Sequence, residues 1–270
     1  MLGAIIGDIA GSVYEFHPHK SKDFPLFSEK SAFTDDTVMT LAVAKALLLY
    51  ETITDMDAFK RELVRVMHEV GMLHPYCGYG GRFFGWLFQK EPQPYNSFGN
   101  GSAMRVSPVA WFYDSLEAVE TAAAVSARVT HNHPEGVKGA QATAAAVFLA
   151  RTGHGKREVR SYLSARFGYD LSRTCDEIRP GCHFDETCQG SVPEAIIAWL
   201  DSDGFEDAIR NAVSLGGDSD TQAAVAGAIA QAEYGIPPEI AREAYRRLDA
   251  PLQTLADDFF LRVMKPKYRR

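Results

Sequence analysis

A chain of 270 residues is long enough to bury a sizeable hydrophobic core, and we expect residues 1–270 to form one domain. Lys and Arg number 28 against 35 Asp and Glu, so the formal charge is −7, and no basic tract is present to support broad nucleic-acid binding. The first residues lack the basic region of a signal peptide and no apolar run could cross a bilayer, so we expect a cytoplasmic protein without membrane contact.

Predicted helices follow one another along most of the chain, because apolar residues recur at helical spacing and alternating strand patterns are nearly absent. The first, over residues 34–50, is apolar on almost its whole circumference and should be central. The others are expected at residues 56–70, 116–129, 135–151, 156–167, 192–200, 205–215, 221–234, 238–248 and 252–263. The sequence therefore predicts an all-α fold, a compact orthogonal bundle of helices.

Local signals mark some boundaries of these helices. Ser191 and Glu194 have the spacing of a capping box, which predicts a helix start at Ser191. Gly216-Gly217 supplies the left-handed residue that ends the preceding helix. Gly- and Pro-rich loops are expected at residues 75–85 and 91–101, without separating a second core.

Two acidic clusters, Thr34-Asp35-Asp36-Thr37 and Asp218-Ser219-Asp220-Thr221, precede predicted helices. Either cluster alone is ordinary helix capping. If the two converge, each pair of carboxylates about 4 Å apart costs on the order of 4 kcal/mol at an effective dielectric constant of about 20. Two divalent cations would offset four carboxylates, and a ligand set made only of oxygens favours Mg²⁺ or Mn²⁺ over Zn²⁺.

Other polar segments leave alternatives open. Residues 98–102 are either an Asn-Gly turn whose backbone N–H groups approach an anion or an ordinary Gly-rich turn. Arg105, which follows, is a phosphate ligand or an ion-pair partner. The histidines of residues 131–136 are most simply loop and cap residues. Residues 182–188 look like a zinc cluster but match no common spacing, so structural cysteines, expected to be reduced, are favoured.

Five stretches of the sequence together resemble the ADP-ribosylglycohydrolase family, which includes dinitrogenase reductase-activating glycohydrolase and the eukaryotic ADP-ribosylhydrolases. They are Gly7-Asp8-x-x-Gly11-Ser12-x-Tyr14-Glu15, Thr34-Asp35-Asp36-Thr37, Ser97-Phe98-Gly99-Asn100-Gly101-Ser102-Ala103-Met104-Arg105, Thr130-His131 and Leu215-Gly216-Gly217-Asp218-Ser219-Asp220-Thr221. The stretches occur in the family's order and cover most of the chain, which is more specific than any single acidic pair.

The resemblance implies an all-α fold with two Mg²⁺ ions bound at helix N-termini, where Mn²⁺ is a possible substitute. It assigns metal-ligand roles to six residues, Thr34, Asp35, Asp36, Asp218, Asp220 and Thr221. Asp35 or Asp36 would position the attacking water. Glu15 would lie on a mobile loop over the site as a candidate acid or base. Without the resemblance, a surface glutamate with no catalytic role would explain this residue nearly as well.

Substrate contacts are implied for five further residues, Gly99, Asn100, Gly101, Ser102 and His133. His133, Glu135 and Gly136 belong to a connection that would lie near the adenosine. Phe184 would also lie near the adenosine, unless its segment is only a variable loop. The acceptor group is left open between arginine, serine, nucleic acid and O-acetyl-ADP-ribose, with a slight preference for the serine type from Tyr14-Glu15 and residues 99–105.

The expected function is that of a monomeric, Mg²⁺-dependent hydrolase. It would remove ADP-ribose from a conjugate by cleaving the glycosidic bond at C1 of the distal ribose, through a transition state with oxocarbenium character. One alternative is a non-catalytic module that binds ADP-ribose or a related nucleotide. Another is a two-metal phosphoesterase, which would release phosphate or AMP in place of ADP-ribose.

Overall fold

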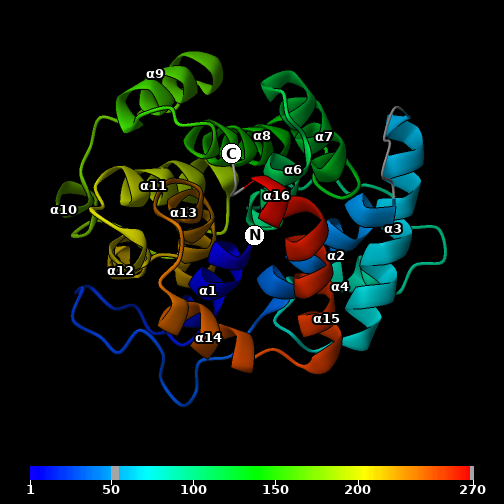
Figure 1. Cartoon of the computed structure of the whole chain (residues 1–270), viewed down its shortest axis with the longest axis horizontal. Helices are drawn as coiled ribbons and strands as arrows, with labels where there is room; N and C mark the ends of the chain where they lie inside the picture. Colours follow the sequence, from blue (N-terminus) through cyan, green and yellow to red (C-terminus); the bar gives the residue numbers. More distant parts are fainter. Residues whose placement is uncertain (50–54, 268–270) are drawn as a thin grey trace.

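The computed structural model describes residues 1–49 and 55–267, and these residues form helices joined by loops (Figure 1). Within those ranges no strand occurs, and only an isolated bridge joins Gly99 to Thr187. The helices are α1 (Leu2–Gly11), α2 (Asp35–Leu49), α3 (Met56–Leu73), α4 (Gly81–Leu87), α5 (Gly101–Met104), α6 (Ser107–Phe112), α7 (Leu116–Arg128), α8 (Pro134–Arg151), α9 (Lys156–Phe167), α10 (Cys175–Ile178), α11 (Cys188–Leu200), α12 (Phe205–Leu215), α13 (Ser219–Tyr234), α14 (Pro238–Arg246), α15 (Ala250–Phe259), the π-helix η1 (Phe260–Met264) and α16 (Lys265–Lys267). The predicted all-α fold is confirmed.

Helices α1 and α13 are the most enclosed part of the core and pack against each other through backbone as well as side chains. Gly3, Gly7 and Gly11 recur every fourth residue, so they lie on one face of α1. A Cβ atom built at Gly7 would lie 2.0 Å from the carbonyl oxygen of Ala223, and one at Gly11 would lie 2.5 Å from the Cα atom of Asp220. Glycine at these positions therefore permits the contact that places the start of α13 beside the end of α1.

The predicted central helix is confirmed as α2, which is buried from Asp36 to Leu48 except at Lys45. Its predicted last residue, Tyr50, lies outside the described residues. Gly216 has φ of 67° and ends α12 in the left-handed conformation, as expected from the Gly-Gly pair.

Some predicted boundaries are wrong. Helix α11 begins at Cys188, one turn before the proposed capping box, because Thr187 accepts a hydrogen bond from the backbone N of Gly190 at 3.1 Å. Ser191 lies inside the helix and donates to the carbonyl oxygen of Thr187 at 2.7 Å, so it caps nothing. The expected loop at residues 75–85 is interrupted by α4, and α1 was not predicted because an apolar helix without a polar face has no periodic pattern.

The long connection between α1 and α2 is the blue trace at the edge of Figure 1, and side chains from distant helices hold it in place. Lys20 Nζ donates to the carbonyl oxygens of Arg179 at 3.0 Å, of Cys182 and of Leu215. Farther along, Arg247 Nη1 donates to the carbonyl oxygens of Ser28 at 2.8 Å and Ser31 at 2.6 Å. These contacts fix the segment that carries Glu15.

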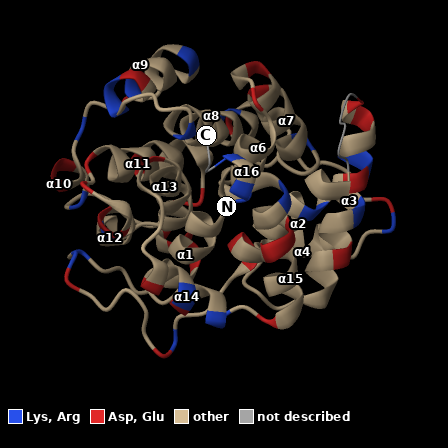
Figure 2. Ribbon diagram, viewed as in Figure 1, with Lys and Arg blue, Asp and Glu red and all other residues tan. Residues whose placement is uncertain are grey.

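Charged residues of both signs are interspersed over the outer helices of the described chain (Figure 2). None of the helices in residues 1–49 and 55–267 has the length and apolar character needed to cross a membrane.

Candidate metal and active site

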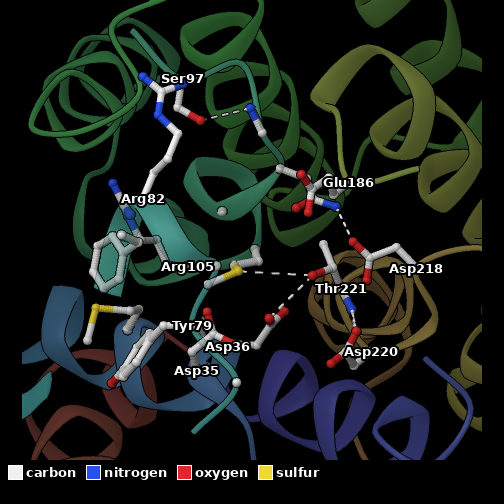
Figure 3. A pocket seen from close by; sticks show the side chains of 18 of the residues that line it. Asp35, Asp36, Tyr79, Arg82, Ser97, Arg105, Glu186, Asp218, Asp220 and Thr221 are labelled. Carbon is white, nitrogen blue, oxygen red and sulfur yellow. Dashed lines mark hydrogen bonds between the residues drawn. The ribbon is translucent and has the colours of Figure 1, made fainter. Parts of the chain in front are cut away.

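The two acidic clusters lie at the N-termini of α2 and α13, and the fold brings these two helix starts together (Figure 3). Thr221 Oγ1 donates to Asp36 Oδ2 at 3.3 Å, although the two residues are 185 positions apart in the sequence. Asp36, Asp218 and Asp220 are 3%, 5% and 4% exposed, so their carboxylates are almost completely removed from bulk water. The convergence left open by the sequence is therefore a feature of the structure.

The electrostatics of this site are unfavourable for four ionised carboxylates. Burial, followed by repulsion from neighbouring carboxylates, raises the pKa of Asp35, Asp36 and Asp220 well above the usual range. Burial also raises the pKa of Asp218 to about 6. Within the described chain no Lys or Arg forms an ion pair with these four groups, so the positive charge that would offset them is not supplied by the protein.

Asp36 gives the clearest indication that a cation fits. Its Oδ1 atom is buried and has no hydrogen-bond partner among the described residues, a state that costs roughly 1–3 kcal/mol for a polar atom and more for a charged one. The surrounding donors are carboxylate and threonine oxygens, which Mg²⁺ and Mn²⁺ prefer. The donor set therefore suits a hard divalent cation.

Asp8 of α1 holds the start of α2 in place, a role that the sequence analysis did not assign to it. This carboxylate, 0% exposed, accepts from Thr34 N at 3.0 Å, Thr34 Oγ1 at 2.7 Å, Thr37 N at 3.1 Å and Thr37 Oγ1. Burial raises the pKa of Asp8 to about 6, against these hydrogen bonds. A single acid in an otherwise apolar segment was the signal that could have identified it.

Glu15 lies at the edge of the acidic cluster, on the turn that follows α1. One oxygen each from Glu15, Asp218 and Asp220 lie within 4.8 Å of one another. Burial and the negative charge of Asp220 raise the pKa of Glu15 to about 8. The adjacent Tyr14 ring packs on Phe24 with the centroids 5.1 Å apart, which anchors this turn to the core.

The acidic cluster opens into a cavity of about 450 Å³. Glu15 and Glu186 line it beside the aspartates, and Phe16 and Phe184 approach each other at its rim with ring centroids 5.8 Å apart. The remaining wall comes from a Gly-rich loop and from side chains of α4 and neighbouring segments. These wall residues are Gly78, Tyr79, Gly80, Gly81, Arg82, Phe83, Tyr95, Ser97, Met104, Arg105 and His131.

The Asn-Gly turn belongs to this cavity. Gly99, Asn100 and Gly101 line it, and Asn100 Nδ2 donates to Asp218 Oδ2 at 2.6 Å and to Ser191 Oγ at 3.1 Å. The asparagine side chain therefore orients one carboxylate of the cluster. A backbone pairing also joins this turn to α11, since Asn100 N donates to the carbonyl oxygen of Glu186 at 2.8 Å.

Three predicted site residues are not among those that line the cavity. Thr34 Oγ1 faces Asp8, as described above. Ser102 is fully buried behind the turn and donates to the carbonyl oxygen of Gly136 at 2.7 Å. His133 caps α8 by accepting from Glu135 N at 3.1 Å, and its ring contacts Phe98. Their direct contact with a metal or substrate stays a prediction.

His131 lines the cavity; it belongs to the quoted Thr130-His131 stretch, but the sequence predicted only a loop or cap position for it. Its Nδ1 lies 2.7 Å from Thr130 Oγ1, and burial together with the charge of Arg105 lowers the pKa of His131 well below its usual range. The ring is therefore neutral at physiological pH. Glu186, Tyr79, Arg82 and Tyr95 also reach the cavity without having been singled out, because their placement depends on how the loops fold back over the helices.

The cysteines near residues 182–188 have separate surroundings. Cys182 Sγ contacts Glu194 Oε2 at 3.2 Å, whereas Cys188 Sγ contacts the carbonyl oxygen of Gly99 at 3.1 Å. All four cysteines are free thiols.

Comparison with known proteins gives consistent results. The family model described as ADP-ribosylglycohydrolase matches residues 1–269. The chain is 30% identical to ADP-ribosylarginine hydrolase Tri1 of Pseudomonas putida (strain GB-1) over 97% of this chain and 77% of that protein. It is 28% identical to ADP-ribosylhydrolase ARH3 of Homo sapiens over 94% of this chain and 91% of that protein. A solved structure described as an ADP-ribosylglycohydrolase-related protein complex aligns with a TM-score of 0.66 and 25% identity over 96% of each chain.

Proposed function

The chain belongs to the ADP-ribosylglycohydrolase family, and we propose that it uses two divalent cations to hydrolyse the bond between an acceptor group and C1 of the distal ribose of ADP-ribose. The observation that carries this proposal is the convergence of two buried acidic clusters at helix N-termini, with one carboxylate oxygen of Asp36 lacking any partner in the described chain. A site of this kind requires cations to offset its charge.

The cations would be held by Thr34, Asp35, Asp36, Asp218, Asp220 and Thr221. Magnesium bound by these residues would orient the ribose hydroxyls and lower the pKa of a bound water. Asp35 or Asp36 would align the attacking water for its approach to C1 of the ribose, where positive charge develops in the transition state. Asn100 keeps Asp218 in position through the hydrogen bond described above.

Glu15 is the proposed acid or base of the reaction. It lies within reach of the same oxygens as Asp218 and Asp220, and it is half-buried at the edge of the cluster. A carboxyl group in such surroundings holds its proton to higher pH than usual, which suits proton transfer to or from the departing acceptor near neutral pH. The turn that carries Glu15 is anchored on one side by Tyr14 and on the other by Lys20.

The names of two relatives bear on the acceptor, the group to which ADP-ribose is attached. One is named for ADP-ribosylarginine and the other more generally as an ADP-ribosylhydrolase. Both carboxylates at the rim, Glu15 and Glu186, are compatible with a cationic acceptor such as arginine, and a proton-donating Glu15 is compatible with an oxygen-linked acceptor such as serine. We therefore propose ADP-ribose conjugates as the substrate class and leave the acceptor to the assay.

The test is an assay of the purified protein against arginine-, serine-, nucleic-acid- and acetyl-linked ADP-ribose, with Mg²⁺ or EDTA, in which released ADP-ribose is measured by mass spectrometry. We expect release from at least one linkage with Mg²⁺ and its loss with EDTA. Tight binding of ADP-ribose without release from any linkage would instead support a binding module. Release of AMP or phosphate would identify a phosphoesterase.

A further inference from the structure

Arg105 is a buried cation in the wall of the cavity, just beyond the short helix α5. Its side chain is 1% exposed, yet the residue lines the cavity. Nη2 donates to the carbonyl oxygen of Ser126 at 3.1 Å and to Thr130 Oγ1 at 2.8 Å. The Nε atom is buried and has no hydrogen-bond partner among the described residues.

No acidic side chain of the described residues forms an ion pair with Arg105, which is unusual for a guanidinium removed from water. Burial lowers the pKa of Arg105 to about 10, so the group still carries its charge at neutral pH. Asp35 acts on it only through space, as a smaller and opposite influence.

Two arginines contribute to the wall of the cavity. Figure 3 shows Arg82 and Arg105 on the side away from Asp218 and Asp220. Arg82 is exposed, and its guanidinium lies over the Tyr95 ring at 4.8 Å, so water weakens its field. Arg105 is therefore the cation whose field acts inside the cavity with little screening.

The balance of charge changes when cations load the acidic cluster. Six acidic side chains line the cavity, and Asp35 among them acts on the charge of Arg105 through space. Divalent cations would cancel that negative field, and Arg105 would then be a buried positive charge without compensation. A buried charge without compensation is unfavourable, so the entry of an anion into the cavity would be favoured.

We propose that Arg105 determines ligand specificity by charge, attracting the diphosphate of ADP-ribose into the cavity once the acidic cluster is neutralised. The inference rests on the proposed function, because it takes ADP-ribose as the ligand. It adds that anion binding and cation binding strengthen each other, and by linkage each ligand must raise the affinity of the other by the same factor.

The experiment measures the affinity of ADP-ribose and of uncharged adenosine for the wild-type protein, Arg105→Gln and Arg105→Lys by calorimetry at saturating Mg²⁺, with adenosine measured by displacement if it binds weakly. Arg105→Gln should weaken ADP-ribose binding at least tenfold and change adenosine binding less than twofold. Arg105→Lys should recover most of the ADP-ribose affinity, since it keeps the charge but not the planar hydrogen bonds. The exposed Arg160→Gln is the matched control and should bind as the wild type does.

Equal weakening of both ligands by Arg105→Gln, with no recovery in Arg105→Lys, would overturn the proposal in favour of a structural role at Ser126 and Thr130. Unchanged affinity for ADP-ribose would overturn it directly. If Arg105→Gln does not fold, the wild-type protein is tested with ADP, which carries the diphosphate but lacks the distal ribose that the cations would orient. ADP must then bind more tightly with Mg²⁺ than with EDTA, and an ADP affinity that does not rise would overturn the proposal. A wild-type protein that shows this coupling but hydrolyses no conjugate would contradict the proposed function and leave the role of Arg105 intact.

Discussion

Asp8 and Asp36 are both enclosed carboxylates, but their surroundings give them different roles. Asp8 accepts hydrogen bonds from backbone and side chain of Thr34 and Thr37, so its charge is satisfied within the protein. Asp36 has one oxygen without any such partner in the described chain. Asp8 therefore stabilises the start of α2, whereas Asp36 has an oxygen atom free to bind the proposed cation.

The first prediction concerns Asp36. Replacing it by Asn keeps the shape of the side chain but removes one of the charges that hold the cations. We expect Asp36→Asn to lower the rate of ADP-ribose release by at least about 10³-fold, since metal activation of water and ribose would be lost. The Tm without metal should stay the same or rise, because one repulsive charge is gone.

The exposed Asp258→Asn is the control for this change, as it removes the same charge far from the cavity. Both variants are compared by kcat for the best conjugate and by the rise in Tm that Mg²⁺ produces. Near-normal turnover in Asp36→Asn, or an undiminished effect of Mg²⁺ on Tm, would contradict the two-cation site.

At the scale of elements, the contact between α1 and α13 decides where the acidic groups lie. Helix α1 ends beside the start of α13, which carries Asp218 and Asp220, and the turn after α1 carries Glu15. Because glycines on α1 let the two backbones touch, the distance between these groups is set by the packing of whole helices.

The second prediction tests this packing with Gly7→Ala. The added Cβ would meet the backbone of α13 at Ala223, and backbone cannot move aside as a flexible side chain can. We expect a loss of about 3 kcal/mol in the free energy of unfolding and a Tm lower by roughly 5–10 °C. Mg²⁺ affinity should fall as well, because the starts of α2 and α13 would be displaced relative to each other.

Gly181→Ala serves as the comparison, since nothing lies within 4 Å of a Cβ atom at that position and its φ is not positive. Thermal unfolding followed by circular dichroism measures both variants, and calorimetry measures their Mg²⁺ affinity. A Gly7→Ala protein as stable as Gly181→Ala would show that α1 can shift without cost.

At the scale of the whole molecule, the burial of the acidic site lowers the stability of the folded protein as pH rises, and the proposed cations would restore it. In the folded state the pKa of Asp218 is raised from 3.8 to about 6, and the pKa of Asp35, Asp36 and Asp220 is raised well above 3.8. Between these values the unfolded chain releases protons that the folded protein retains, so stability falls as pH rises. Below pH 4 this penalty is absent, and it grows as pH rises through the raised pKa values, the share of Asp218 being complete above about pH 6.

The third prediction follows from this loss of stability with rising pH. The rise in Tm caused by Mg²⁺, measured against EDTA at the same pH, should be larger at pH 7.5 than at pH 5 by roughly 5 °C or more. At the lower pH protons already neutralise the carboxylates and compete with the metal. Differential scanning fluorimetry at both pH values measures the effect, and Asp36→Asn should reduce it. A Mg²⁺ effect that is equal at the two pH values would contradict the assignment of these carboxylates to the cation site.

The sequence by itself determined the helical class, the position of most long helices and the two acidic clusters. These features depend on neighbours within a few turns: the apolar face of a helix repeats every three or four residues, and a left-handed Gly216 stops α12 where it stands. The motifs also determined the family resemblance, because they lie in short unbroken stretches. At the start of α11 two local capping signals compete, and the prediction from Ser191 is wrong because the hydroxyl of Thr187 accepts from Gly190 N one turn earlier.

Only the tertiary structure decided what those residues face. Asp36 and Thr221 meet across 185 positions of sequence, and Asp8 supports Thr34 and Thr37 from another helix. Arg105 has no ion pair within residues 1–49 and 55–267 and donates instead to Ser126 and Thr130, since its surroundings come from several segments. Such distances depend on how entire helices pack, and the free energy of that packing is shared by the whole core. Short motifs therefore name the candidates, and the fold determines their burial, their partners and their charge.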